Sequence, residues 1–145
     1  MKQYRFALIG CGRISKNHIA AAIANQDIMQ LVAVCDPVTE RAEKKAADYF
    51  AATGKKPAVY ADFHKMLAEM EIDCCAIATE SGYHARIALE CIRAGKNTLV
   101  EKPMALSTRD AEQMIREAKE KGVTLGVCHQ NRFNAPIQQL HKALD

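Results

Sequence analysis

Short apolar runs that do not alternate with polar residues recur along this sequence, and they constrain the fold more than any other feature. The first is Phe6-Ala7-Leu8-Ile9 and the second is Leu31-Val32-Ala33-Val34-Cys35. A strand that is apolar on both sides must be covered on both faces, as in a parallel sheet flanked by helices. Stretches with helical spacing separate the runs, as in repeated βαβ units. The sequence therefore predicts one α/β domain with a doubly wound, mostly parallel sheet.

Local signals place the boundaries of these elements. We expect strands over residues 6–9, 31–35, 57–60, 74–78, 98–100 and 124–127, and helices over 14–25, 38–53, 63–70, 83–94, 108–121 and 136–144. Asp62 and Ser107 stand at N-cap positions, and Asp110, three residues after Ser107, indicates a capping box. Gly54 and Gly122 follow two of the helices directly, where a C-cap glycine is common.

Composition and charge exclude several classes of protein. The chain has 20 Lys and Arg against 17 Asp and Glu, a net charge of +3 that is spread along the sequence. Without a basic run or stripe, we expect no nucleic-acid partner and no membrane partner. No apolar stretch approaches the roughly 20 residues that span a bilayer. Residues 1–5 lead into a short apolar run without a cleavage site, so we expect a cytoplasmic protein.

The six cysteines indicate neither a metal site nor a disulfide framework. They are Cys11, Cys35, Cys74, Cys75, Cys91 and Cys128. Their spacings match no zinc pattern, and a protein without a secretory signal is not expected to depend on disulfides. We therefore expect reduced thiols, most of them small core residues, and no bound metal. Cys11 differs from the others because it lies inside a glycine-rich turn.

That turn ends the first apolar run. Residues 10–15 read Gly-Cys-Gly-Arg-Ile-Ser, a G-x-G-x-x-S version of the dinucleotide fingerprint. Gly10 allows the tight turn, Gly12 lets the backbone approach a pyrophosphate, and the third position must be small for helix and strand to pack. Ser15 stands there in place of the usual Gly or Ala. A helix that starts here offers free N–H groups to an anion, so we expect Gly10, Gly12, Arg13 and Ile14 to contact a dinucleotide.

Asp36 closes the second apolar run and supplies the acidic residue that the fingerprint requires. A carboxylate at this place accepts hydrogen bonds from the adenosine ribose hydroxyls and repels a 2′-phosphate, which favours NAD over NADP. In the alternative interpretation, Asp36-Pro37 is a simple turn and Asp36 caps the next helix. Arg41 lies one helical turn further on and is able to meet a 2′-phosphate, but we expect a solvated helix residue.

Glu101-Lys102-Pro103 follows the fifth expected strand. Ligands of open parallel sheets bind beyond the carboxyl ends of the strands, so a lysine here is able to face the cofactor cleft. Its ammonium has the chemistry to hydrogen-bond a substrate hydroxyl and to assist proton transfer as hydride leaves. Spacing alone leaves open the alternative of an ordinary surface lysine.

These motifs together resemble the Gfo/Idh/MocA oxidoreductases, named for glucose–fructose oxidoreductase and inositol dehydrogenase. The matching segments are residues 10–15, Asp36, Thr79 with His84, Glu101-Lys102-Pro103 and Asn131-Arg132-Phe133. The resemblance covers essentially the whole chain, and the Glu-Lys-Pro turn is its most specific element. It implies a Rossmann domain, NAD or NADP as cofactor, and oxidation or reduction of a carbinol carbon on a sugar, an inositol or a sugar nucleotide. It also implies that Lys102 is catalytic.

The same resemblance extends the list of expected cofactor contacts. The full set is Gly10, Gly12, Arg13, Ile14, Asp36, Thr79, Ser81, His84, Glu101, Lys102, Gln130, Asn131 and Arg132. The family's usual Pro-Asn pair after Thr79 is replaced here by Glu80-Ser81. We expect His84 to be held by hydrogen bonds at the start of a helix rather than to act as an acid or a base. The cofactor is expected to be NAD rather than NADP.

Family members continue into a second, α+β domain that supplies much of the substrate pocket, the dimer face and a catalytic His. We therefore assign residues 1–128 to a Rossmann domain, and residues 129–145 to an active-site loop and the start of a crossover helix to a C-terminal domain that is absent. We expect this chain to bind cofactor with little or no turnover, and the full-length protein to form homo-oligomers. Residues 100–140 are especially similar to members that oxidise UDP-N-acetyl-glucosaminuronate at C3.

Two alternatives from other functional classes stay open on the sequence. One is a stand-alone dinucleotide-binding module that senses NAD(H) or regulates a partner without catalysis. The other is an S-adenosylmethionine-binding domain, which uses a similar glycine-rich turn and acidic residue. Neither alternative explains the Glu-Lys-Pro turn, because neither requires an ammonium group at the far end of the cleft.

Overall fold

A single parallel sheet organises the chain. In a computed structural model, which describes residues 3–144, the strand order is β3-β2-β1-β4-β5-β6. The strands are β1 (Tyr4–Ile9), β2 (Met29–Cys35), β3 (Ala58–Tyr60), β4 (Cys74–Ile77), β5 (Asn97–Glu101) and β6 (Leu125–Cys128). All adjacent pairs are parallel, and the order reverses between β1 and β4. The expected α/β, doubly wound fold is therefore confirmed.

Helices α1 to α5 lie between consecutive strands, and α6 follows the last strand. They are α1 (Ser15–Ala24), α2 (Thr39–Thr53), α3 (Phe63–Glu69), α4 (His84–Arg93), α5 (Thr108–Lys121) and α6 (Ala135–Leu144), with 3₁₀ turns η1 (Ser81–Tyr83) and η2 (Gln130–Phe133). Met1, Lys2 and Asp145 lie outside the described residues, so the expectations for residues 1–5 and 129–145 fall partly there. No helix among residues 3–144 is long and apolar enough to cross a membrane.

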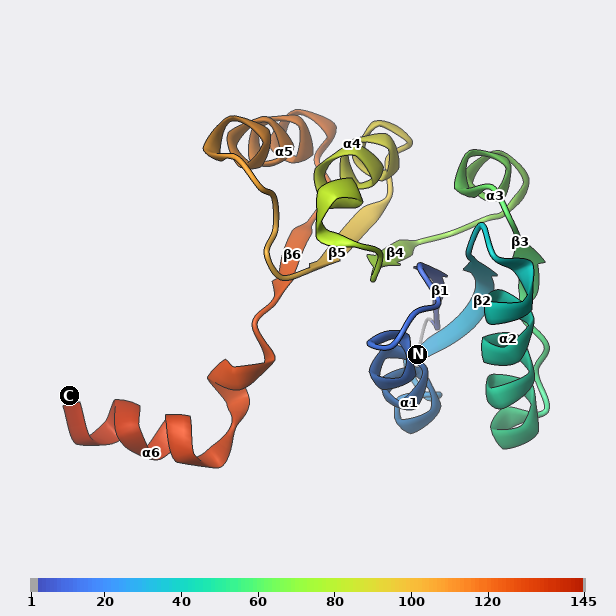
Figure 1. Cartoon of the computed structure of the whole chain (residues 1–145), viewed down its shortest axis with the longest axis horizontal. Helices are drawn as coiled ribbons and strands as arrows, with labels where there is room; N and C mark the ends of the chain where they lie inside the picture. Colours follow the sequence, from blue (N-terminus) through green and yellow to red (C-terminus); the bar gives the residue numbers. More distant parts are fainter. Residues whose placement is uncertain (1–2, 145) are drawn as a thin grey trace.

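The sheet is covered on both faces, which explains the apolar runs without alternation. From β1, Ala7 and Ile9 enter one core with residues of α3, α4 and α5. Phe6 and Leu8 enter the other core, with residues of α1 and α2. Figure 1 shows these two sets of helices on opposite sides of the sheet. Successive side chains of a strand point to opposite faces, so every position of a central strand must be apolar.

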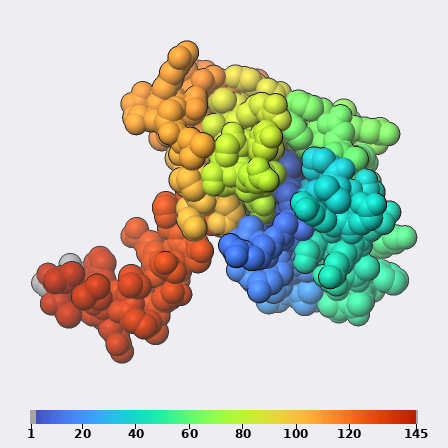
Figure 2. Space-filling view, in the orientation of Figure 1, coloured from blue at the N-terminus to red at the C-terminus, as the bar shows by residue number. Residues whose placement is uncertain are grey.

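The C-terminal segment differs from the rest because it leaves the body of the domain. Figures 1 and 2 show α6 standing apart from the sheet. None of its described residues is buried, and Ile137, Leu140 and Leu144 are exposed. The predicted helix over 136–144 is therefore confirmed, whereas its role as a crossover helix stays a prediction.

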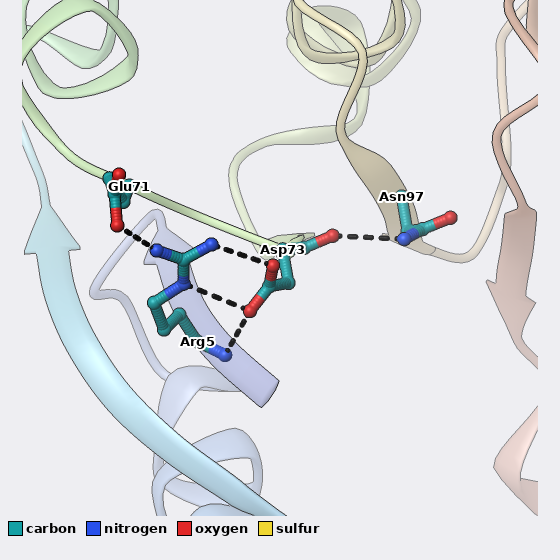
Figure 3. A network of polar contacts seen from close by, with 4 residues as sticks. All are labelled: Arg5, Glu71, Asp73 and Asn97. Atoms are coloured by element: carbon teal, nitrogen blue, oxygen red, sulfur yellow. Dashed lines mark hydrogen bonds and ion pairs between the residues drawn. The ribbon is translucent and has the colours of Figure 1, made fainter. Parts of the chain in front are cut away.

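A polar network fixes the amino ends of the central strands, opposite the edge where ligands bind (Figure 3). The Arg5 backbone N–H donates to Asp73 Oδ2 at 2.8 Å, and its guanidinium binds both Asp73 oxygens at 3.0 and 2.9 Å. Glu71 makes a further ion pair with the same guanidinium. Asn97 Nδ2 donates to the Asp73 carbonyl at 3.0 Å and thereby joins β5 to the network. These contacts lock the register of β1, β4 and β5.

The expected boundaries agree with the structure to within about two residues, as usual for helix and strand ends. Asp62 accepts from the His64 N–H, and Ser107 accepts from the Asp110 N–H, so both predicted N-caps are confirmed. The most consequential error concerns Glu101, which we placed after the fifth strand. It is the last residue of β5 and pairs with Cys128 of β6. A charged residue at a strand end has the local signal of a turn, but here the buried His18 side chain stabilises Glu101 within the sheet.

Candidate dinucleotide site

A cleft of about 490 Å³ lies at the carboxyl ends of β1, β2 and β4. It is formed by the glycine turn after β1, residues 36–38 after β2 and the loop after β4. Six of the expected cofactor contacts line it, namely Gly10, Gly12, Arg13, Ile14, Asp36 and Thr79. The cleft spans the point where the strand order reverses, which is where doubly wound sheets bind nucleotides.

The two glycines of the turn have different roles. Gly10 has φ +94°, and a Cβ there would meet the Ala78 carbonyl carbon at 2.6 Å, so Gly10 allows β1 and the loop after β4 to touch. A Cβ on Gly12 would have no atom within 4 Å, because Gly12 faces the open cleft. The turn thus has the free space beside the backbone that a pyrophosphate requires.

The start of α1 fits an anionic ligand. No side chain caps this helix, whose N-cap residue is Ile14. The Ser15 N–H donates to the Gly12 carbonyl at 3.2 Å, and the Asn17 N–H donates to the Ile14 carbonyl at 3.0 Å. The positive end of the helix dipole therefore favours a phosphate here. Ser15 is fully buried, and its hydroxyl donates to the Gly12 carbonyl at 2.5 Å. This bond gives the hydroxyl a partner and explains why Ser is compatible with the position where the fingerprint usually has Gly or Ala.

Asp36 holds the glycine turn in place. Its Oδ2 accepts from the Cys11 N–H at 2.8 Å and its Oδ1 accepts from the Val38 N–H at 2.9 Å. It does not cap α2, whose N-cap residue is Val38 without a side-chain bond, so that part of the alternative interpretation is wrong. Each carboxylate oxygen has a second lone pair, which leaves Asp36 able to accept from a ligand hydroxyl.

Basic side chains surround the Asp36 end of the cleft. An adjoining hollow shares Gly12, Arg13 and Arg41 with the first cleft. It is lined further by Lys16, Lys44 and Lys45. These cations raise the local potential and attract phosphate groups. The sequence did not show this cluster, because its members are dispersed along α1 and α2 and only the fold brings them together.

Tyr83 is a lining residue that sequence reasoning missed. It is half exposed at the end of η1 and lines the same cleft as Thr79 and Glu80. The Arg86 guanidinium carbon lies 5.3 Å from the centre of its ring. A large aromatic residue in the loop that follows a central strand was the one available signal.

Cys11 lies in the turn but is not a reactive thiol. It is buried, and burial together with the nearby Asp36 carboxylate raises its pKa to about 12. Because the thiolate is the reactive form, native Cys11 should react with iodoacetamide at pH 8 on the order of 10³-fold more slowly than a free cysteine of pKa about 8.5. Mass spectrometry after timed alkylation measures this, with the urea-unfolded chain as control. Rapid labelling of native Cys11 that NADH prevents would contradict the prediction.

His84 joins the loop after β4 to the turn after β5. It is buried, with Nδ1 2.7 Å from the Pro103 carbonyl oxygen and Nε2 3.1 Å from the Thr79 carbonyl oxygen. The expectation that hydrogen bonds hold His84 at a helix start is confirmed. Because both ring nitrogens face backbone carbonyls, its contact with a cofactor stays a prediction.

The remaining expected residues lie at or beyond the ends of β4, β5 and β6, outside the lined cleft. Lys102 is exposed in the turn after β5, and within residues 3–144 its ammonium has no hydrogen-bond or ion-pair partner. Glu101 is buried, with Oε1 2.9 Å from His18 Nε2. Ser81 begins η1, while Gln130, Asn131 and Arg132 form exposed η2 after β6. All of these positions lie at or after the carboxyl ends of strands, the edge where ligands bind.

Comparison with known proteins agrees with this geometry. Residues 4–129 match the Gfo/Idh/MocA model, described as an oxidoreductase family with an NAD-binding Rossmann fold. The chain belongs to the Gfo/Idh/MocA oxidoreductase family. The predicted resemblance, fold class and NAD-binding character are thereby confirmed.

Three similar proteins have the names of different dehydrogenases. The WlbA dehydrogenase of Bordetella pertussis, solved with NADH and UDP-GlcNAcA, is 40% identical, with a TM-score of 0.85 over 99% of this chain and 42% of that one. The UDP-N-acetylglucosamine 3-dehydrogenase of Acidithiobacillus ferrooxidans is 31% identical over 99% of this chain and 42% of its own length. The 4-carboxy-2-hydroxymuconate-6-semialdehyde dehydrogenase of a Sphingobium strain is 31% identical over 97% and 42%. The chain therefore spans about two fifths of these relatives.

Proposed function

We propose that this chain is the cofactor-binding part of an NAD-dependent dehydrogenase that acts on a secondary alcohol of a sugar or sugar nucleotide. The observation that carries the proposal is the cleft at the reversal of strand order, where Gly12 faces open space and Asp36 flanks the turn. A helix without a side-chain cap begins beside that turn, so the positive end of its dipole would face a pyrophosphate. Residues 129–145 would form the active-site loop and the start of the crossover helix.

The two ends of the cofactor would meet different strands. Asp36 and Thr79 would bind the adenosine side, and Gly12, Arg13 and Ile14 the pyrophosphate, because these residues line the cleft over β1, β2 and β4. The nicotinamide side would then extend toward β5 and β6. The residues proposed there are Ser81, Glu101, Lys102, Gln130, Asn131 and Arg132. NAD, when bound, supplies the hydride acceptor.

Lys102 is proposed as the catalytic residue of the chain. Its ammonium is exposed beyond the end of β5, the edge where the nicotinamide side would lie. There it would hydrogen-bond the substrate oxygen and stabilise its negative charge, while the proton would pass to the catalytic His expected from the second domain and the hydride to NAD. His84 would support this role indirectly, because it binds the carbonyl of Pro103, the next residue after Lys102.

A sugar nucleotide is the proposed substrate class. The support is the 40% identity to a structure that holds UDP-GlcNAcA together with NADH, and the similarity that residues 100–140 bear to enzymes of that branch. The Sphingobium relative, by its name, acts on a semialdehyde instead. We further propose a cytoplasmic protein, supported by six free thiols, which suit a reducing compartment. Homo-oligomers of the full-length protein stay a prediction.

Titration of the 145-residue chain with NADH, NADPH and S-adenosylmethionine tests the proposed cofactor. Fluorescence of the reduced nicotinamide measures binding of NADH and NADPH. Displacement of bound NADH measures binding of S-adenosylmethionine. NADH should bind more tightly than NADPH, because the Asp36 carboxylate repels a 2′-phosphate. Absence of NADH binding, or displacement of NADH by S-adenosylmethionine at low concentration, would contradict the proposal.

Replacement of Lys102 tests the proposed chemistry. Lys102→Ala should change the NADH affinity of the 145-residue chain little, because most of the proposed cofactor contacts lie in the cleft over β1, β2 and β4, which Lys102 does not line. In the full-length protein, Lys102→Ala should lower kcat by about 10²–10⁴-fold, the usual contribution of a residue that assists proton transfer. Lys121→Ala, an exposed lysine at the end of α5, is the matched control. Unchanged kcat in Lys102→Ala would favour a binding module in which Lys102 has no chemical role.

A further inference from the structure

A buried polar pair lies between α1 and the end of β5, and none of the roles above uses all of it. His18 and Glu101 are each 8% exposed, and Nε2 of His18 lies 2.9 Å from Oε1 of Glu101. The thiol of Cys128, at the end of β6, joins them, because one ligand atom from each of the three residues lies within 4.8 Å of the others. Three elements distant in sequence therefore meet at one buried carboxylate.

His18 and Glu101 connect the glycine turn with the edge where Lys102 lies. His18 is in the first turn of α1, the helix that starts at the glycine turn. Glu101 directly precedes Lys102. Because the adenosine side of the cleft lies over β1 and β2, a dinucleotide bound across the strand reversal would extend its nicotinamide toward Glu101.

The buried Glu101 carboxylate requires a hydrogen-bond donor, and it is able to accept from a second donor as well. A buried carboxylate without hydrogen bonds is strongly unfavourable, so the hydrogen bond with His18 stabilises Glu101 and fixes its orientation. A carboxylate accepts about four hydrogen bonds, and His18 and Cys128 occupy part of that capacity. The primary amide of a nicotinamide ring carries two N–H donors, which a fixed carboxylate is able to accept.

We propose that His18 is a positioning residue, which holds the Glu101 carboxylate where it accepts a hydrogen bond from the nicotinamide carboxamide. The inference rests on the proposed function, since it requires a dinucleotide in the cleft. It deepens that function, because it assigns recognition of the nicotinamide half to a residue of α1. The same three side chains also carry donor types that zinc uses, so a metal site is the competing assignment.

Two variants of similar size isolate the hydrogen bond. His18→Met fills the space without a donor, whereas His18→Gln retains an N–H that is able to reach Glu101. NADH and ADP-ribose are the two probes, because ADP-ribose lacks the nicotinamide ring. His64→Met is the control, since His64 is exposed on α3. Circular dichroism and thermal melting verify that each variant of the 145-residue chain is folded.

We expect a loss of binding affinity only for the ligand that carries a nicotinamide ring. His18→Met should weaken NADH binding by about tenfold, the value of one charge-assisted hydrogen bond, and leave ADP-ribose binding unchanged. His18→Gln should recover most of the NADH affinity, and His64→Met should match the parent chain. Equal weakening of both ligands, or unchanged NADH affinity in His18→Met, would overturn the proposal.

Two further outcomes separate this inference from its alternatives. Binding of neither NADH nor ADP-ribose by the parent chain would refute the proposed function itself, and the role of His18 with it. Tight Zn²⁺ binding by the parent chain that His18→Met abolishes would assign the cluster to a metal and overturn the positioning role. Retained ADP-ribose binding in all variants, together with the NADH-specific loss, supports both proposals.

Discussion

Gly12→Ala is expected to weaken NADH binding by about 10- to 100-fold and to leave the domain folded. The added Cβ meets no protein atom within 4 Å, so the free chain has no reason to lose stability. It occupies the space that the proposed pyrophosphate needs, and overpacking of one carbon costs about 1–3 kcal/mol. Fluorescence titration with NADH measures the affinity, and thermal melting measures the stability. An alanine variant that binds NADH as tightly as the parent chain would refute the placement of the pyrophosphate.

Gly10→Ala is the matched comparison, because the same added methyl should have the opposite consequence. Gly10 has φ +94°, and its Cβ would lie 2.6 Å from the Ala78 carbonyl carbon, which is backbone and cannot rotate away. Backbone strain and overpacking each cost about 1–3 kcal/mol, a large fraction of the stability of a small domain. Gly10→Ala should therefore lower the melting temperature strongly. A normal melting temperature for this variant would contradict the close approach of β1 and the loop after β4.

Asp36→Asn is expected to change the ratio of NADH to NADPH affinity by about 10- to 100-fold in favour of NADPH. The substitution removes the negative charge that repels a 2′-phosphate, and a like-charge contact near a protein surface costs a few kcal/mol. The basic groups of Arg13, Arg41, Lys44 and Lys45 remain beside the position. Parallel titrations with the two reduced cofactors measure the ratio.

The stability of this variant must be followed together with its affinity. Asparagine has one acceptor oxygen where Asp36 has two, so either the Cys11 or the Val38 N–H loses its partner, at about 1–3 kcal/mol. Asp27→Asn is the control, because Asp27 is an exposed carboxylate in the turn before β2, away from the cleft. An unchanged affinity ratio in Asp36→Asn, with the fold intact, would show that Asp36 acts only on the turn and does not select the cofactor.

The fold and half of the candidate site followed from local patterns. The apolar runs predicted the strands because a central strand must be apolar on both faces, and Ala7 and Ile9 indeed face one core while Phe6 and Leu8 face the other. The glycine turn and Asp36 were predictable because their functions depend on backbone shape and on the end of a strand, both of which are coded within a few residues. The place of Glu101 within β5 was not predictable, since a charged residue at a strand end is locally indistinguishable from a turn.

The sequence by itself determined which strands and helices follow one another along the chain. It also determined the glycine turn that faces the cleft and the Asp36 carboxylate beside that turn. Only the tertiary structure decided which distant groups meet. It showed that Asp36 binds the Cys11 N–H, that basic residues of two helices form one rim, and that His18 pairs with Glu101, 83 positions along the chain. The physical reason is that a backbone conformation depends on neighbouring residues, whereas a hydrogen bond between side chains depends on how separate elements pack. That packing is set by the whole core and is not present in any local pattern.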